Sequence, residues 1–168
     1  MILDEAYLED RLAKSKMIEG AFALAAAGIL PLEKATYEIT PSANIYYTWL
    51  APSEFVGKLV VWFDEVEIVL ATNTIHTHIG AGDYRRRHGY LLEGEMSCED
   101  EEFVQFIAEA AVIEAAAIMS GNRVFASGGR GKGGMKFPLD VWESRNDGSS
   151  FDEMGVRFWT WHEEIFRS

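Results

Sequence analysis

Residues 57–79 read GKLVVWFDEVEIVLATNTIHTHI, and this stretch decides the fold. The runs Leu59–Phe63 and Val66–Ala71 are apolar on both alternating faces, which is typical of central strands covered on two sides. Between them, Asp64-Glu65 is placed to turn a hairpin. Over residues 74–79 apolar and polar side chains alternate, so the two sets point to opposite faces. The stretch therefore predicts three neighbouring strands of one sheet.

Two alanine-rich helices flank this stretch. Apolar residues at helical spacing predict a helix at about 3–28, closed by Gly28, and a second helix at about 98–120. Ser97 is the expected N-cap of the second helix, whose acidic first turn suits the positive end of the helix dipole. The expected core stripe of that helix is Phe103, Phe106, Ile107, Ala110, Ile113 and Ala117.

The order of these elements predicts an α+β fold. We expect one domain over residues 1–168, with a mainly antiparallel sheet packed against the two long helices, because no repeat and no linker interrupts the chain. The remaining strands are expected over residues 35–40, 44–50, 89–96, 123–127 and 156–161.

Net charge excludes some function classes. The chain has 168 residues with 27 Asp and Glu against 15 Lys and Arg, which gives a formal charge of −12. Affinity for nucleic acid comes largely from cations that neutralise phosphates. We therefore expect no direct binding to nucleic acid or to an anionic membrane. At 48% hydrophobic residues, the composition is that of a globular domain.

The sequence also gives an expectation for the cellular compartment and for cofactors. Cys98 is the single cysteine, so no internal disulfide can form, and a reducing cytoplasm is the expected location. The acidic start Met1–Glu5 does not resemble a secretory signal, and the longest apolar run, Ala21–Leu32, is too short to span a membrane. No cofactor motif is complete, so we expect no cofactor.

A glycine-rich loop contains the pattern G-x-G-x-x-G at Gly129, Gly131 and Gly134. A dinucleotide-binding loop opens a helix, whereas Met135–Pro138 is a poor helix start. Two interpretations stay open for this loop. It is a simple hairpin connection, or it binds an anion through Arg130 and Lys132.

Histidines provide another candidate site. His76 and His78 are expected on one face of a strand, where two imidazoles could share a metal ion with Asp83 or His88 as a third ligand. A metal-dependent hydrolase is one alternative for this pattern. The simpler interpretation is that the histidines are solvated beside Arg85–Arg87.

Acidic residues give the largest feature of the sequence. No Lys or Arg occurs between Arg87 and Arg123, while eight carboxylates fall inside that interval. Such a surface is either only solubilising or attracts a basic protein, since complementary charge steers association. Aromatic residues are enriched at interface hot spots. The candidate partner-binding residues are Asp64, Glu65, Glu67, Glu93, Glu95, Glu99, Asp100, Glu101, Glu102, Trp159 and Trp161.

In overall character, a compact, acidic, cysteine-poor α+β domain rich in Trp and Tyr resembles the immunity proteins of bacterial contact-dependent growth inhibition and other polymorphic toxin systems. The resemblance implies a cytoplasmic inhibitor, not an enzyme, that neutralises a basic cognate toxin, often a nuclease. Inhibition would occlude the active site or the substrate surface of the toxin.

The alternative is a small enzyme or a ligand-binding domain for an anionic small molecule. Two short basic segments, Arg85–Arg87 and 130–136, would hold the anion near His76 and His78, with or without a metal. The sequence leaves both hypotheses open.

Overall fold

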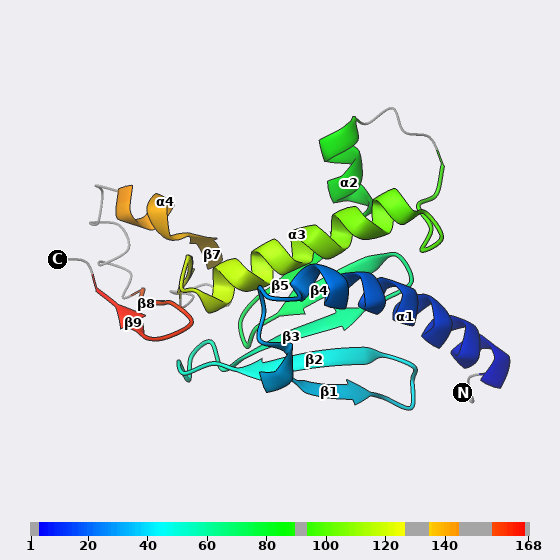
Figure 1. Ribbon diagram of the computed structural model, residues 1–168. Helices are drawn as coiled ribbons and strands as arrows, with labels where there is room; N and C mark the ends of the chain where they lie inside the picture. The colour runs from blue at the N-terminus through cyan, green and yellow to red at the C-terminus, as the bar shows by residue number, and fades with distance from the viewer. Residues whose placement is uncertain (1–3, 90–93, 127–134, 145–155, 167–168) are drawn as a thin grey trace.

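The protein has the expected α+β architecture (Figure 1). The computed structural model describes residues 4–89, 94–126, 135–144 and 156–166. A five-stranded antiparallel sheet lies against two long helices, and a smaller sheet follows at the other end of the molecule.

The large sheet is a simple meander. Its strands follow chain order, each antiparallel to the next, which agrees with the expected antiparallel sheet and with the hairpin expected at Asp64-Glu65. Residues 64–67 turn the central hairpin, where the Asp64 nitrogen donates to the Glu67 oxygen at 2.9 Å. The strands are β1 (Thr36–Ile39), β2 (Ile45–Leu50), β3 (Lys58–Phe63), β4 (Glu67–Ala71) and β5 (His76–Gly80).

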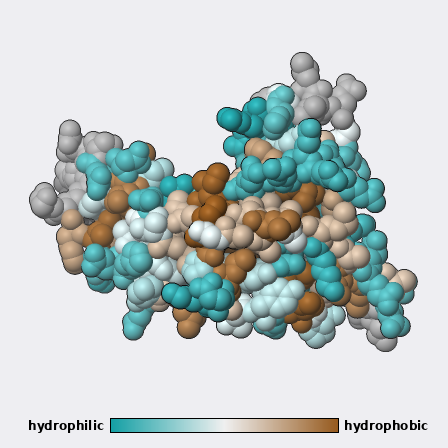
Figure 2. All heavy atoms as spheres, in the orientation of Figure 1, coloured by the Kyte–Doolittle hydropathy of each residue, from teal (hydrophilic) through white to brown (hydrophobic). Residues whose placement is uncertain are grey.

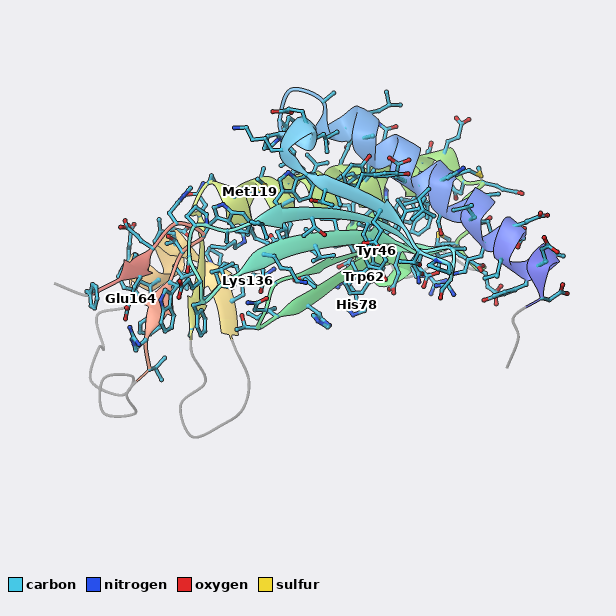
Figure 3. All side chains as sticks on the ribbon, turned by 90° about the horizontal axis from the view of Figure 1, so that it is seen from below. Tyr46, Trp62, His78, Met119, Lys136 and Glu164 are labelled. Atoms are coloured by element: carbon cyan, nitrogen blue, oxygen red, sulfur yellow. The ribbon has the colours of Figure 1, made fainter. Side chains whose placement is uncertain are left out.

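One face of this sheet carries the core. Val61 and Phe63 of β3 and Ile68 of β4 are fully buried on that face, because the strand period of two points alternate side chains toward the helices. Tyr46, Trp62, Val69 and His78 are paired in register across four strands on the opposite face. Figure 3 shows three of them side by side.

The helices α1 (Glu5–Ala26) and α3 (Glu101–Met119) lie next to each other on the buried face and begin at the same end of the molecule (Figure 1). Asp4 caps α1 by accepting a hydrogen bond from the Ala6 nitrogen at 3.2 Å. Gly28 follows α1 with a φ of 74°, a conformation that favours glycine.

Two expectations about α3 are wrong. Its N-cap is Asp100, which accepts from the Phe103 nitrogen at 3.1 Å, while Ser97 accepts from the Glu99 nitrogen just before the helix. Ile113 is 67% exposed and does not belong to the core stripe. The buried side of α3 is wider than a single stripe because the helix contacts both α1 and the sheet.

The outer surface of the two helices is partly apolar. Leu24 of α1 is 81% exposed, and Ile113 is its counterpart on α3. Figure 2 shows hydrophobic side chains along the middle of these helices and hydrophilic side chains over the start of α3 and the segment that precedes it.

That segment contains a helix that the sequence did not predict, α2 (Ala81–His88). Asp83 stabilises its start by accepting from the Gly80 nitrogen at 3.1 Å, and Tyr84 is buried beneath it. The strand expected over residues 89–96 is wrong for its described part, because Gly89 and residues 94–96 are not in a strand. Residues 90–93 lie outside the described chain.

The smaller sheet has the strand order β7-β6-β8-β9. The expected strand over residues 156–161 is reduced to β8 (Phe158–Trp159), and the short helix α4 (Leu139–Ser144) follows β7 (Met135–Pro138). The glycine loop with Arg130 and Lys132 lies outside the described residues. The remaining elements are η1 (Leu32–Lys34), β6 (Arg123–Ala126) and β9 (Glu164–Ile165).

A membrane-spanning helix is not found among the described residues: none of their helices has the length and apolar character that crossing a bilayer requires.

Candidate functional site

A cleft of about 680 Å³ opens where the large sheet, the helices α2 and α3, and the smaller sheet meet. Its volume lies within the range of small-molecule sites. We call it the cationic cleft, because two arginines of α2, one arginine of β6 and one lysine of β7 line it. Its lining residues are Thr77, Ile79, Asp83, Arg86, Arg87, Phe106, Ala110, Glu114, Arg123, Lys136 and Pro138.

The floor of the cleft is an ion cluster centred on Glu114. Arg123 binds this carboxylate through two donors, with its Nε 3.0 Å and its Nη2 2.7 Å from Oε2. Lys136 donates to the other carboxylate oxygen and to the Thr77 hydroxyl, the latter at 2.7 Å. The three charged side chains are only 14–22% exposed. The cluster therefore fixes α3, β5, β6 and β7 together.

Strand register explains how two of these cations reach the same place. Arg123 of β6 pairs with Pro138 of β7, and Phe125 pairs with Lys136. Residues directly opposite in a pair share a face, so Arg123, Lys136 and Pro138 all project from one face of the smaller sheet. This face lines the cationic cleft.

Glu114 is ionised at neutral pH. Burial alone would raise the pKa of this carboxyl, but hydrogen bonds from Arg123 and Lys136 and their positive charges outweigh it, and the net effect is a lowered pKa. The carboxylate therefore acts as a permanent counter-ion that holds both cations in position. It is not suited to exchange protons near pH 7.

The charges in the cleft do not cancel. Four cations stand against the two carboxylates Asp83 and Glu114, which leaves two positive charges uncompensated among the described lining residues. Arg86 is paired with Asp83 at 2.7 Å, while the described part of the chain offers Arg87 no hydrogen bond or ion pair. A cavity with surplus positive charge concentrates anions.

One wall of the cleft is apolar. Phe106 and Ala110 of α3 face it together with Ile79 and Pro138. The Phe106 ring is held in place by edge contacts with the rings of Tyr84, at 5.3 Å between centroids, and of His88, at 5.8 Å. The site thus combines cationic donors with a supported aromatic surface.

The histidines expected to join such a site lie elsewhere. Thr77 and Ile79 point into the cleft, so His76 and His78, which alternate with them on β5, point to the opposite face of the sheet. His78 contacts Glu67 at 3.2 Å and His76 packs edge-on against Trp62. Within the described ranges, no three His, Cys, Asp or Glu side chains are grouped as metal ligands.

The predicted acidic residues come together at one end of the molecule, where α1 and α3 begin and β3 turns into β4 (Figure 1). A groove of about 420 Å³ there is lined by Glu65, Glu95 and Ser97. Glu93 lies outside the described residues, and Glu67 faces His78 instead. We call this region the acidic end; its members are Asp4, Glu5, Glu9, Asp10, Asp64, Glu65, Glu95, Glu99, Asp100, Glu101 and Glu102.

Several of these carboxylates have internal partners. Asp64 lies 3.6 Å from Arg11, Glu65 lies 3.4 Å from Lys14, and Asp100 caps α3. By contrast, Glu95, Glu99, Glu101 and Glu102 are exposed.

Neither predicted tryptophan lies at the acidic end. Trp161 is 4% exposed and belongs to the core, so its ring has almost no surface for a partner. Trp159 is half-buried in the smaller sheet, stacked on Phe55 with 3.8 Å between ring centroids. Cys98 is buried as well, which removes it as a surface nucleophile.

Three residues that form the floor of the cleft were not among the candidate site residues expected from the sequence: Thr77, Glu114 and Arg123. A signal for Glu114 was present: it is the single charged residue between Glu109 and Arg123, in the otherwise apolar second half of α3. Such an isolated charge on a buried helix requires a partner.

Comparisons with known proteins give no relative. No protein-family model matches the sequence, and no curated protein or solved structure is significantly similar to the chain.

Proposed function

We propose that this protein binds an anionic small molecule in the cationic cleft. The proposal rests on one observation: a chain with a net charge of −12 places four cations around one cavity, whose described lining residues include only two carboxylates. Concentrating scarce cations in a cleft has an energetic cost from mutual repulsion, which a bound anion would relieve.

The ion cluster prepares the cleft for such a ligand. Because Glu114 holds Arg123 and Lys136 in fixed positions, little side-chain entropy is lost when an anion binds. Lys136 uses two of its three N–H groups on Glu114 and Thr77, which leaves one donor for the ligand. Arg87 of α2 supplies a second cation, for which the described residues provide no ion-pair partner.

Anion binding is tested by thermal unfolding in inorganic phosphate and, at equal ionic strength, in chloride. Phosphate should raise the Tm of the wild-type protein, because a ligand that binds only the folded state stabilises it. Arg87→Gln and Lys136→Gln should each remove most of this increase. The matched control is Lys34→Gln, an exposed lysine of η1 outside the cleft, which should respond like the wild type. Equal responses in all four proteins would refute the proposal.

A second candidate function is inhibition of a basic protein by the acidic end, as in the immunity proteins that the sequence resembles. The observation that favours it is the convergence of exposed carboxylates from α1 and from residues 95–102. None of the residues of the acidic end lines the cationic cleft, so the two candidates make different predictions.

The inhibitor hypothesis is tested with the protein encoded by the neighbouring gene, which in toxin systems is the toxin. Binding should weaken steeply with salt and after Glu99→Lys, Glu101→Lys and Glu102→Lys combined. Arg87→Gln should leave it unchanged. A lack of binding at low salt would exclude this candidate.

A further inference from the structure

We propose that the ligand of the cationic cleft is a compact dianion bonded to an apolar, flat group, such as an aryl phosphate or an aromatic dicarboxylate. This inference rests on the proposed function and specifies its ligand. It is drawn from the charge surplus, the apolar wall and the size of the cleft.

The charge surplus has a definite location. Arg86 is neutralised by Asp83, and the cluster of Glu114 with Arg123 and Lys136 retains one positive charge. Arg87 contributes the second. The surplus charge of the cluster is shared by Arg123 of β6 and Lys136 of β7, and the other belongs to Arg87 of α2; among the described residues no further carboxylate lines the cavity. A doubly charged head group placed between them would neutralise both, whereas a monoanion would leave one uncompensated.

The apolar wall provides the second half of the site. Phe106 and Ala110 are four residues apart on α3, so their side chains lie one above the other on the same helical face. Ile79 and Pro138 extend this surface from β5 and β7. A head group alone would leave these apolar side chains in contact with water, while a flat ring would cover them.

Size supports the same ligand class. A cleft of about 680 Å³ falls in the range that holds molecules of drug or cofactor-fragment size. An inorganic anion would occupy the charged part and leave the rest to solvent.

Isothermal titration calorimetry tests the inference with four probes: phenyl phosphate, phthalate, inorganic phosphate and benzyl alcohol. The better of the two aromatic dianions should bind about tenfold more tightly than inorganic phosphate, because the ring buries apolar area against Phe106. Benzyl alcohol, which has the ring without the charge, should show no measurable binding. The order of phenyl phosphate and phthalate identifies which dianion the cleft prefers.

Variants of the apolar wall test whether that wall, and not the charged part of the site, binds the ring. Phe106→Ala should remove the tenfold gain and leave the affinity for inorganic phosphate unchanged, which also shows that the variant is folded. Ala110→Leu should have the same effect by filling the apolar part without removing a core ring. Ile113→Ala, an exposed position on the same helix, is the control and should keep the gain.

The outcomes distinguish this inference from the proposed function. The inference would be overturned if phosphate binds but the aromatic dianions bind no more tightly, or if their higher affinity persists in both variants. In either case the proposal of anion binding would remain. Binding of none of the three anions would overturn both.

Discussion

The cationic cleft and the acidic end use charge in opposite ways. In the cleft, Glu114 and its two cations are 14–22% exposed and joined by direct hydrogen bonds across four elements. At the acidic end, the pair of Lys14 with Glu65 is 37% and 35% exposed, and Glu99, Glu101 and Glu102 form no ion pair with a Lys or Arg of the described chain. The net charge of −12 therefore describes the acidic end well and the cleft not at all.

We infer from this difference that charges in the cleft contribute mainly to stability, whereas charges at the acidic end contribute mainly to binding. Charges withdrawn from water must be paired, and removing one partner leaves another buried charge without compensation. Exposed charges are screened by water and salt, so each contributes little to stability. Their main effect is to attract charged partners over a distance. Four predictions test this contrast.

The largest effect is expected in the cleft. Glu114→Ala removes the counter-ion of both Arg123 and Lys136, so the free energy of unfolding should fall by about 3 kcal/mol, as for other broken buried pairs. Urea unfolding measures it. Phosphate should restore more stability in this variant than in the wild type, because the released cations can bind it.

Glu109→Ala is the matched control for this change. Glu109 is an exposed carboxylate on the same helix that accepts a hydrogen bond from the Gln105 side chain at 2.8 Å. Its loss should alter the free energy of unfolding by less than about 0.5 kcal/mol. Similar losses in the two variants would mean that the cleft is no more tightly coupled than the surface.

The second prediction concerns pH. The pKa of Glu114 in the folded protein lies below its ordinary value of 4.5, because the hydrogen bonds and charges of Arg123 and Lys136 outweigh the opposite effect of burial. As the pH falls, Glu114 is protonated in the unfolded chain, where its pKa is ordinary, before it is protonated in the folded protein. The stabilisation that the ionised carboxylate provides is therefore complete above pH 4.5 and is lost as the pH falls through the pKa of the folded state.

Wild type and Glu114→Gln should therefore differ most near pH 7 and converge at acid pH, since a protonated glutamic acid resembles glutamine. Urea midpoints between pH 7 and pH 3 provide the measurement. Because every other carboxylate titrates in both proteins, the difference isolates Glu114. A constant difference across this range would contradict the lowered pKa.

Sequence patterns predicted the large sheet and the two long helices because local rules dominate there. The apolar runs within residues 59–71 predicted the central strands, and the alternation of residues 74–79 predicted the faces of Thr77 and His78. The α+β class followed from the order of these elements. Helix α2 escaped prediction because its apolar contribution is little more than Tyr84, and a hydrogen bond to Asp83 starts it.

The cationic cleft could not be predicted because it depends on contacts between distant segments. Thr77, Glu114 and Lys136 are 22 to 59 residues apart in the chain and meet only when β7 pairs with β6. The two basic segments of the alternative hypothesis do contribute Arg86, Arg87 and Lys136. Their expected companions His76 and His78 do not, because the period of a strand places them on the other face.

The third prediction concerns the boundary of α3 at the acidic end. Asp100→Ala removes the side chain that accepts from the Phe103 nitrogen, so the free energy of unfolding should fall by about 1 kcal/mol. Ser97→Ala, at the N-cap that the sequence suggested, should have a smaller effect. Urea unfolding distinguishes them, and a larger loss in Ser97→Ala would place the functional cap at Ser97.

The smallest effect is expected for an ion pair of the acidic end. Glu65→Gln breaks the contact with Lys14, but it also relieves repulsion from the surrounding carboxylates, and Lys14 keeps Asp10 at 2.8 Å. The lost attraction to Lys14 and the relieved repulsion among carboxylates have opposite effects on stability. Both effects are small, because the two side chains are about one-third exposed to water. The urea midpoint should therefore stay within experimental error of the wild type at low and at high salt. A loss as large as that of Glu114→Ala would show that the acidic end is held together as the cleft is, and its carboxylates would then be structural rather than free to meet a basic partner.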